Sequence, residues 1–191
     1  SDSTGRSRPA GRSAMAGWAT AAAILLVISS GLILMLQGRR GEERAALEYQ
    51  AQVSEVSDLH IATLAAGLGP QVVSSDRHTV KPWFQGKLPF SFNLPDNLPA
   101  DTKLDGADLT YLHNQPVAQL LYTIGRHRVS VFLTERRSGE PMDGKQSERS
   151  GFKVTSVGVG DLDIVAVSDV DQARLAELVS LIRSVQTGAK S

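Results

Sequence analysis

An uncharged, apolar run near the N-terminus limits the structures that this chain can form. From Gly17 to Gln37 the sequence reads GWATAAAILLVISSGLILMLQ. A helix rises about 1.5 Å per residue, so roughly twenty residues cover the ~30 Å hydrocarbon layer of a bilayer. Inside a bilayer the backbone polar groups must be paired within the segment, which one helix achieves. We therefore expect a transmembrane helix over residues 17–37, with the lipid bilayer as its partner.

A cleaved secretory signal peptide is the alternative to a retained anchor. The apolar stretch of a signal peptide has about 7–15 residues and ends at a small-residue cleavage site, whereas this run is longer and continues into Gln37–Arg40. The pattern favours a retained span, preceded by a short basic tail over residues 1–16. Three arginines stand on each side of the run: Arg6, Arg8, Arg12, Arg39, Arg40 and Arg44. The positive-inside rule therefore leans only slightly towards a cytoplasmic N-terminus.

Residues 38–70 are typical of a helical stalk behind the span. Apolar or aromatic side chains recur there every three to four positions: Tyr49, Val53, Val56, and Leu59 or His60. This spacing indicates one helical stripe, which should end at Gly67–Pro70 because Gly and Pro in that order stop helices. The stripe favours docking on the chain's own domain or exposure to solvent, since it lacks the leucines of a coiled coil. A homodimer through the span or the stalk stays open.

Residues 71–187 are predicted to form a small extracytoplasmic α+β domain. Short apolar runs bounded by turn residues indicate five strands: Leu109–Leu112, Val117–Ile124, Arg128–Thr134, Phe152–Val159 and Leu162–Ser168. The polar stretch Arg136–Ser150 reads as an exposed loop. A closing helix from Asp169 to about Val185, with Ser168 as its N-cap, should cover the sheet with its apolar face. The predicted fold class is thus α+β: one transmembrane helix with a helical stalk, then a small antiparallel sheet covered by a C-terminal helix.

Composition excludes several classes of function. Lysine and arginine together number 20 and are balanced by 20 acidic residues, so no basic surface suggests a nucleic-acid partner. The chain has no cysteine, which excludes disulfides, thiolate metal sites and thiol nucleophiles.

Three local motifs that suggest chemistry do not meet its requirements. Ser74–His78 holds a hydroxyl, a carboxylate and an imidazole, but catalytic triads assemble from distant parts of a fold, so a turn or capping role is the simpler interpretation. The four histidines, His60, His78, His113 and His127, match no zinc spacing. Gly158–Asp163 lacks the third glycine of a dinucleotide loop and leads into a strand. We predict no enzyme, and no catalytic, metal or cofactor residue.

The segment after Gln71 holds the candidate contact residues. Four prolines, Pro82, Pro89, Pro95 and Pro99, should exclude a regular helix and hold the aromatic side chains on a rigid, irregular stretch. His78, Lys81, Trp83 and Phe84 form a basic and aromatic group that could contact a partner or a signal. The alternative is that Trp83 and Phe84, beside two prolines, are a plug of the hydrophobic core.

Three stretches of the sequence resemble one known family. They are SSDRHTVKPWFQGKLPFSF (Ser74–Phe92), LDGADLTYLHNQPVAQLLYTIGRHRVSVFL (Leu104–Leu133) and VSDVDQARLAEL (Val167–Leu178). With the span, they look like the extracytoplasmic part of bacterial membrane-spanning anti-sigma factors. The resemblance implies a regulator of transcription: a cytoplasmic N-terminal module sequesters an extracytoplasmic-function sigma factor, and the outer domain responds to envelope conditions. It also implies a single-pass protein of the inner membrane, with the N-terminus in the cytoplasm and the C-terminal domain in the periplasm.

The chain departs from this family at its N-terminus. The family's inhibitory module precedes the membrane helix and often carries a His/Cys zinc motif, whereas sixteen residues without cysteine precede the run here. Either that module lies upstream of Ser1, where it would hold the sigma factor, or it has been lost. The alternative function is a membrane-tethered binding or assembly module of the cell envelope without a sigma partner.

Overall fold

The computed structural model describes residues 12–136 and 144–187, and for residues 12–28 and Ser30 it describes only the helical backbone. Residues 1–11 of the predicted tail and residues 137–143 of the predicted loop lie outside this part. The chain forms two compact units, Ser1–Tyr49 and Gln50–Ser191. Among the described residues, no helix is both long enough and apolar enough to cross a membrane.

Helix α1 runs without a break from Arg12 to Ala66. It ends directly before Gly67, which adopts a left-handed φ of 60° that closes helices readily because glycine has no Cβ. The helix therefore stops where the sequence predicts. Its C-terminal part belongs to the second unit and is described with it below.

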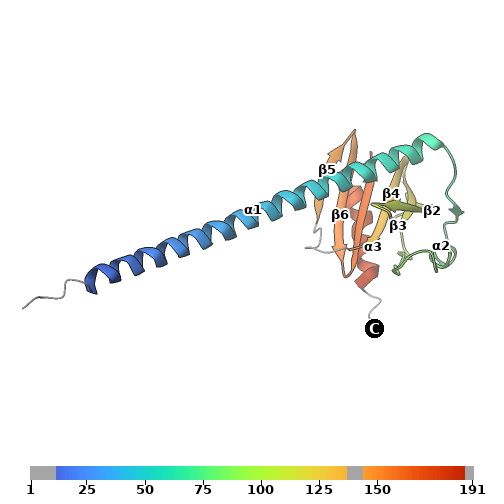
Figure 1. Cartoon of the computed structure of the whole chain (residues 1–191). Helices are drawn as coiled ribbons and strands as arrows, with labels where there is room; N and C mark the ends of the chain where they lie inside the picture. Colours follow the sequence, from blue (N-terminus) through green and yellow to red (C-terminus); the bar gives the residue numbers. More distant parts are fainter. Residues whose placement is uncertain (1–11, 137–143, 188–191) are drawn as a thin grey trace, which may run out of the picture. The chain divides into compact units, whose positions relative to one another are not determined.

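The second unit is built on one antiparallel sheet of seven strands, ordered β1-β2-β3-β4-β7-β6-β5 (Figure 1). Its strands are β1 (Val72–Val73), β2 (Thr102–Leu112), β3 (Gln115–Ile124), β4 (His127–Glu135), β5 (Lys145–Arg149), β6 (Phe152–Val159) and β7 (Leu162–Ser168). Short turns connect β2, β3 and β4 in one meander and β5, β6 and β7 in another. The two meanders join where β4 pairs with β7, with Val129 opposite Ser168 and Glu135 opposite Leu162.

Three parts of the sheet differ from the sequence prediction. Strand β5 lies inside the stretch 136–150, which was expected to be a loop, because its residues KQSER carry no apolar alternation. Strand β2 begins at Thr102 instead of Leu109, and a bulge between Leu104 and Gly106 interrupts the alternation of its faces. Strand β1, only two residues long, has no sequence signal of its own.

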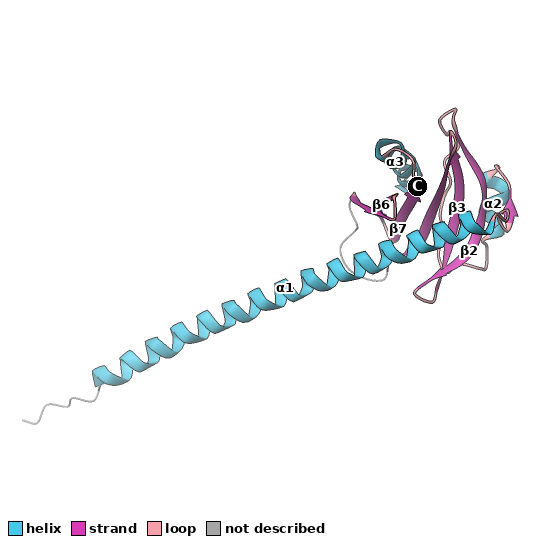
Figure 2. Cartoon of the chain, turned by 90° about the horizontal axis from the view of Figure 1, so that it is seen from above, coloured by secondary structure: helices cyan, strands magenta, loops and turns pink. Residues whose placement is uncertain are grey.

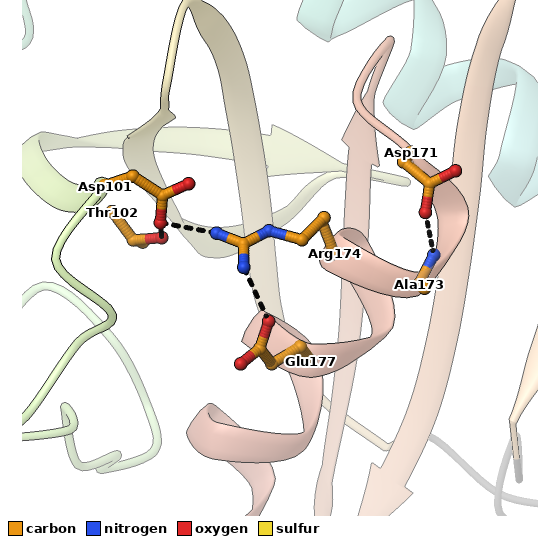
Figure 3. A network of polar contacts seen from close by, with 6 residues as sticks. All are labelled: Asp101, Thr102, Asp171, Ala173, Arg174 and Glu177. Atoms are coloured by element: carbon orange, nitrogen blue, oxygen red, sulfur yellow. Dashed lines mark hydrogen bonds and ion pairs between the residues drawn. The ribbon is translucent and has the colours of Figure 1, made fainter.

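Helix α3 (Gln172–Thr187) covers one face of the sheet over β6 and β7. Its apolar stripe consists of Leu175, Leu178 and Ile182. The stripe packs on inward-facing residues of the central strands: Leu120, Tyr122, Val131, Leu133 and Ile164. The predicted covering helix is confirmed, but its N-cap is not Ser168. Asp171 accepts a hydrogen bond from the backbone N–H of Ala173 at 2.8 Å, so the helix begins three residues later (Figure 3).

The C-terminal part of α1 docks on the opposite face of the sheet (Figure 2). Gln119 of β3 and Ser130 of β4 alternate with residues of the α3-side core, and their side chains form hydrogen bonds with Thr63 and His60 of α1. Val53 and Val56 of α1 are buried at 2% and 0% exposure. The helical stripe of the stalk thus packs on the chain's own domain, which was one of the two favoured alternatives.

Candidate functional site

The segment that holds the predicted contact residues begins with a capped turn. Ser74 Oγ accepts a hydrogen bond from the backbone N–H of Asp76 at 3.0 Å, and Asp76 Oδ1 accepts one from the N–H of His78 at 2.8 Å. Asp76 is therefore the N-cap of a short helix, α2 (Arg77–Trp83). The capping interpretation of the Ser74–His78 motif is confirmed.

The helix α2 contradicts the expectation that prolines exclude helix from this segment. Pro82 lies inside the last turn of α2. Proline already has a helical φ, and in so short a helix its missing N–H removes only one backbone hydrogen bond. The chain then leaves the helix through tighter bonds, from the N–H of Phe84 to the carbonyl of Lys81 and from the N–H of Gln85 to that of Pro82.

Four aromatic rings follow one another from α2 into the next loop. Trp83 meets Phe84 edge to face at 4.9 Å between centroids, and Phe84 meets Phe92 in the same way at 5.4 Å. Phe90 lies 6.5 Å from Phe92. Phe84 and Phe92 are each only 3% exposed and belong to the main core. The core-plug interpretation therefore holds for Phe84, while Trp83 remains partly exposed and carries the ammonium group of Lys87 at 3.3 Å above its ring.

A cavity of about 480 Å³ opens beside these rings, in the loop between α2 and Phe92. Its apolar lining comes from Phe84, Leu88, Phe90 and Phe92 among others, and Lys81 also lines it. Such a volume is within the range of small-molecule sites, roughly 300–1,000 Å³. We call the cavity lined by these five residues the aromatic cavity.

The structure brings together only part of the predicted group. Lys81 and Phe84 line the aromatic cavity, whereas Trp83 does not. His78 is exposed and borders two smaller hollows next to Arg77. The predicted contact role of these residues is not tested by this placement and stays a prediction.

The residues that hold Lys81 in place have no signal in the local sequence. Lys81 Nζ donates a hydrogen bond to Asn93 Oδ1 at 2.7 Å. The backbone N–H of Asn93 donates to Gln186 Oε1, and Gln186 Nε2 donates back to the carbonyl of Asn93, both at 2.8 Å. Gln186 lies on α3, so this exchange ties the loop to the C-terminal helix across a long sequence separation.

A second polar centre lies where α1 meets the sheet. His60 is 1% exposed, and its Nδ1 is 2.8 Å from Ser130 Oγ, which also accepts a hydrogen bond from Gln119 Nε2. Its ring meets Phe152 edge to face at 4.9 Å. Its Nε2 has no hydrogen-bond partner among the described residues. Burial lowers the pKa of His60 from 6.5 to about 4, an effect that the negative charge of Asp169 partly offsets.

Metal ligands do not gather at either place. Within residues 12–136 and 144–187, no group of three or more histidine, aspartate or glutamate side chains is placed to hold a metal ion.

No protein-family model matches the chain, and no curated relative matches it. The solved structures that are similar to part of it include two of a MucA/MucB complex. A structure of the Pseudomonas aeruginosa MucA/MucB complex is 23% identical with a TM-score of 0.38, over 44% of this chain and 32% of that chain. A crystal structure of MucB in complex with MucA(peri) is 20% identical with a TM-score of 0.36, over 44% and 34%. The chain spans about a third of the length of those chains.

Proposed function

We propose that this chain is the membrane anchor and outer domain of an anti-sigma factor that restrains an extracytoplasmic-function sigma factor. The observation that carries the proposal is that the three stretches resembling that family contribute to one core. The core residues from these stretches are Val80, Phe84 and Phe92, then Leu104, Tyr122 and Leu133, then Val170, Leu175 and Leu178. A resemblance spread along the sequence thus belongs to a single folded domain, as expected if the chain shares the family's outer domain.

The anchor in this proposal is the apolar run over residues 17–37. Leu32 to Leu36, in the described end of this run, are exposed by between 44% and 68%. An exposed, contiguous apolar stretch of this kind marks a surface that contacts a protein or a membrane, and in the proposal this contact is with a bilayer. The tail before it would then lie in the cytoplasm, and the domain after it in the periplasm of a bacterial inner membrane.

The regulatory role rests on the continuity of α1. The helix that carries the apolar run at its N-terminal end is held at its other end by the sheet, through Val53, Val56 and His60. In the proposed function, a change in the outer domain alters how the helix docks and is passed along α1. The sigma factor is held by sequence upstream of Ser1, and the outer domain binds its signal without catalysing a reaction.

Affinity recovery from membranes tests this proposal. The complete gene product and, in parallel, the chain from Ser1 are purified from membranes of the source organism, and the bound proteins are identified by mass spectrometry. We expect the complete product to recover a sigma factor and the chain from Ser1 to recover none. A variant with Leu26→Arg in the apolar run serves as the control for membrane residence. Recovery of no sigma factor by either form would contradict the proposal.

The aromatic cavity favours a second candidate, a membrane-tethered binding or assembly module of the cell envelope. Its opening lies on a segment whose Lys81 side chain is exposed and forms no salt bridge with a described residue. This candidate becomes the preferred function if the complete product recovers an envelope component in place of a sigma factor.

A further inference from the structure

The aromatic cavity has walls that do not depend on a ligand. Phe84 and Phe92 are fixed by the core on one side and by their edge-to-face contact on the other. Pro82 and Pro89 restrict the backbone at both ends of the intervening loop. A volume of about 480 Å³ bounded in this way is pre-formed, so a ligand that enters it does not have to order its walls.

One lysine, Lys81, is among the residues that line the cavity, and its ammonium group is held by hydrogen bonding. Lys81 Nζ donates to Asn93, which Gln186 and the carbonyl of Val185 hold in place from α3. An ammonium group has three donor hydrogens, and this contact uses one of them. No carboxylate of the described residues forms a salt bridge with Lys81, whereas the neighbouring Arg77 is paired with Asp96. The charge of Lys81, which lines the cavity, is thus not neutralised by a carboxylate of the described residues.

From the cavity and the positioned ammonium group we infer that this site binds a small amphiphilic anion, with its apolar body against Phe84, Phe90 and Phe92 and its anionic head on Lys81 Nζ. This inference takes the outer domain to receive a signal, as proposed above, and names the chemical class of that signal. A cation is disfavoured, because both Lys81 and the nearby Lys87 repel it. A neutral apolar molecule leaves the ammonium group without a counter-charge.

The two tryptophans of the chain allow a direct binding measurement. Trp18→Phe leaves Trp83, next to the cavity, as the only reporter. The full chain carrying this substitution is placed in lipid nanodiscs and titrated with decanoate while Trp83 emission is recorded. We expect a saturable change, and weaker binding of the neutral analogue decanol. Partition of either probe into the bilayer gives a signal that does not saturate and is equal for all variants.

Two substitutions separate the site from its surroundings. Lys81→Gln removes the charge and should weaken decanoate binding about tenfold, as expected for the loss of a hydrogen bond to a charged group. Lys103→Gln makes the same chemical change on β2, where the lysine is exposed and paired with Asp105, and should leave binding unchanged. Lys81→Gln should also make decanoate and decanol bind alike. Thermal unfolding of each variant verifies that the fold is kept.

Three results would overturn the inference: no saturable decanoate signal, equal binding of decanoate and decanol to the Lys81 form, or equal effects of Lys81→Gln and Lys103→Gln. None of them involves a sigma factor. A negative result here therefore does not change the result of the recovery experiment. If the recovery experiment fails, the ligand site can still be measured by itself.

Discussion

The two faces of the sheet are closed in different ways. On one face, α3 and the segment from α2 to Phe92 pack through apolar side chains such as Leu175, Leu178 and Phe84. On the other, α1 docks through a mixture of apolar and polar groups, in which Val56 lies beside Ser57 and His60. Apolar burial stabilises the first face without a directional requirement, whereas buried polar groups need defined partners. The α3 face therefore supplies stability, and the α1 face fixes where the helix sits.

Some buried polar atoms on the α1 face also lack hydrogen-bond partners. His60 Nε2, Ser156 Oγ and Gln52 Oε1 are buried without a hydrogen-bond partner among the described residues. A buried donor or acceptor without a partner costs about 1–3 kcal/mol. The docking of α1 is thus weaker than its buried area suggests.

The largest effect is expected on the α3 face. Leu175 is fully buried, so Leu175→Ala should lower the free energy of unfolding by about 2–5 kcal/mol, through lost transfer energy and the cavity it leaves. Leu68→Ala is the matched control, because Leu68 is 79% exposed. Urea unfolding followed by Trp83 fluorescence, with Trp18→Phe in both variants, measures both. Similar midpoints for the two variants would contradict the assignment of stability to this face.

On the α1 face we expect the contribution of His60 to the free energy of unfolding to change by about 3 kcal/mol with pH. The folded chain holds His60 neutral, with its pKa lowered to about 4, while the unfolded chain binds a proton near pH 6.5. Each pKa unit corresponds to about 1.4 kcal/mol. The contribution of His60 is therefore fully present above pH 6.5 and is lost as the pH falls from 6.5 through 4.

Comparison with His60→Leu isolates this contribution from the titrating carboxylates. The free energy of unfolding is measured at pH 7.5 and pH 4.5 for both forms, with His78→Leu as a control at an exposed histidine. Wild type and His78→Leu should lose more stability on acidification than His60→Leu. An equal loss in all three forms would show that the buried imidazole does not matter to the α1 face.

A smaller effect is expected where the connection from α1 meets the sheet. Gly106 has a φ of 153°, and a Cβ there would lie 2.2 Å from the carbonyl oxygen of Val72 and 2.5 Å from Pro70 Cγ. Gly106→Ala should displace β1 and cost about 2 kcal/mol, whereas Gly125→Ala, with a φ of 59° and open space, should cost about 1 kcal/mol from backbone strain alone. Faster hydrogen exchange at Val73 in the first variant only is the readout.

The smallest effect is expected at the surface network of α3. Arg174 bridges Asp101, directly before β2, and Glu177 on its own helix, and all three are at least a third exposed (Figure 3). Solvent screens such pairs, so Arg174→Met should change the free energy of unfolding by less than about 1 kcal/mol. A larger loss, measured in the same urea series, would mean that the α3 face depends on charge as well as on apolar packing.

The sequence predicts the centre of the sheet better than its edges. Strands β6 and β7 have the predicted bounds, and β3 and β4 differ from them by one or two residues, because apolar side chains mark them clearly. The edge strand β5 shows no such pattern, since only one of its residues is partly buried. The sequence does not predict helix α2, because prolines disfavour helix, although a proline near the end of a short helix such as Pro82 is tolerated.

The candidate site was only partly predictable. Its local members, Lys81 and Phe84, lie within a few residues of one another and stand out by type. Asn93 and Gln186, which fix the lysine, are far apart in sequence and meet only through the packing of α3 on the sheet. The pairing of His60 with Ser130 is of the same kind, because it depends on how α1 crosses β4.

The proposed anchoring of an outer domain by residues 17–37 can be tested by cysteine labelling, because the chain has no cysteine of its own. Single cysteines are placed at Ser3, in the tail, and at Leu68, which is 79% exposed, and both variants are treated with a membrane-impermeant maleimide in intact spheroplasts. We predict that Leu68→Cys is labelled at once and that Ser3→Cys is labelled only after permeabilisation. Labelling of Ser3→Cys in intact spheroplasts, or protection of Leu68→Cys, would contradict the anchor and its orientation.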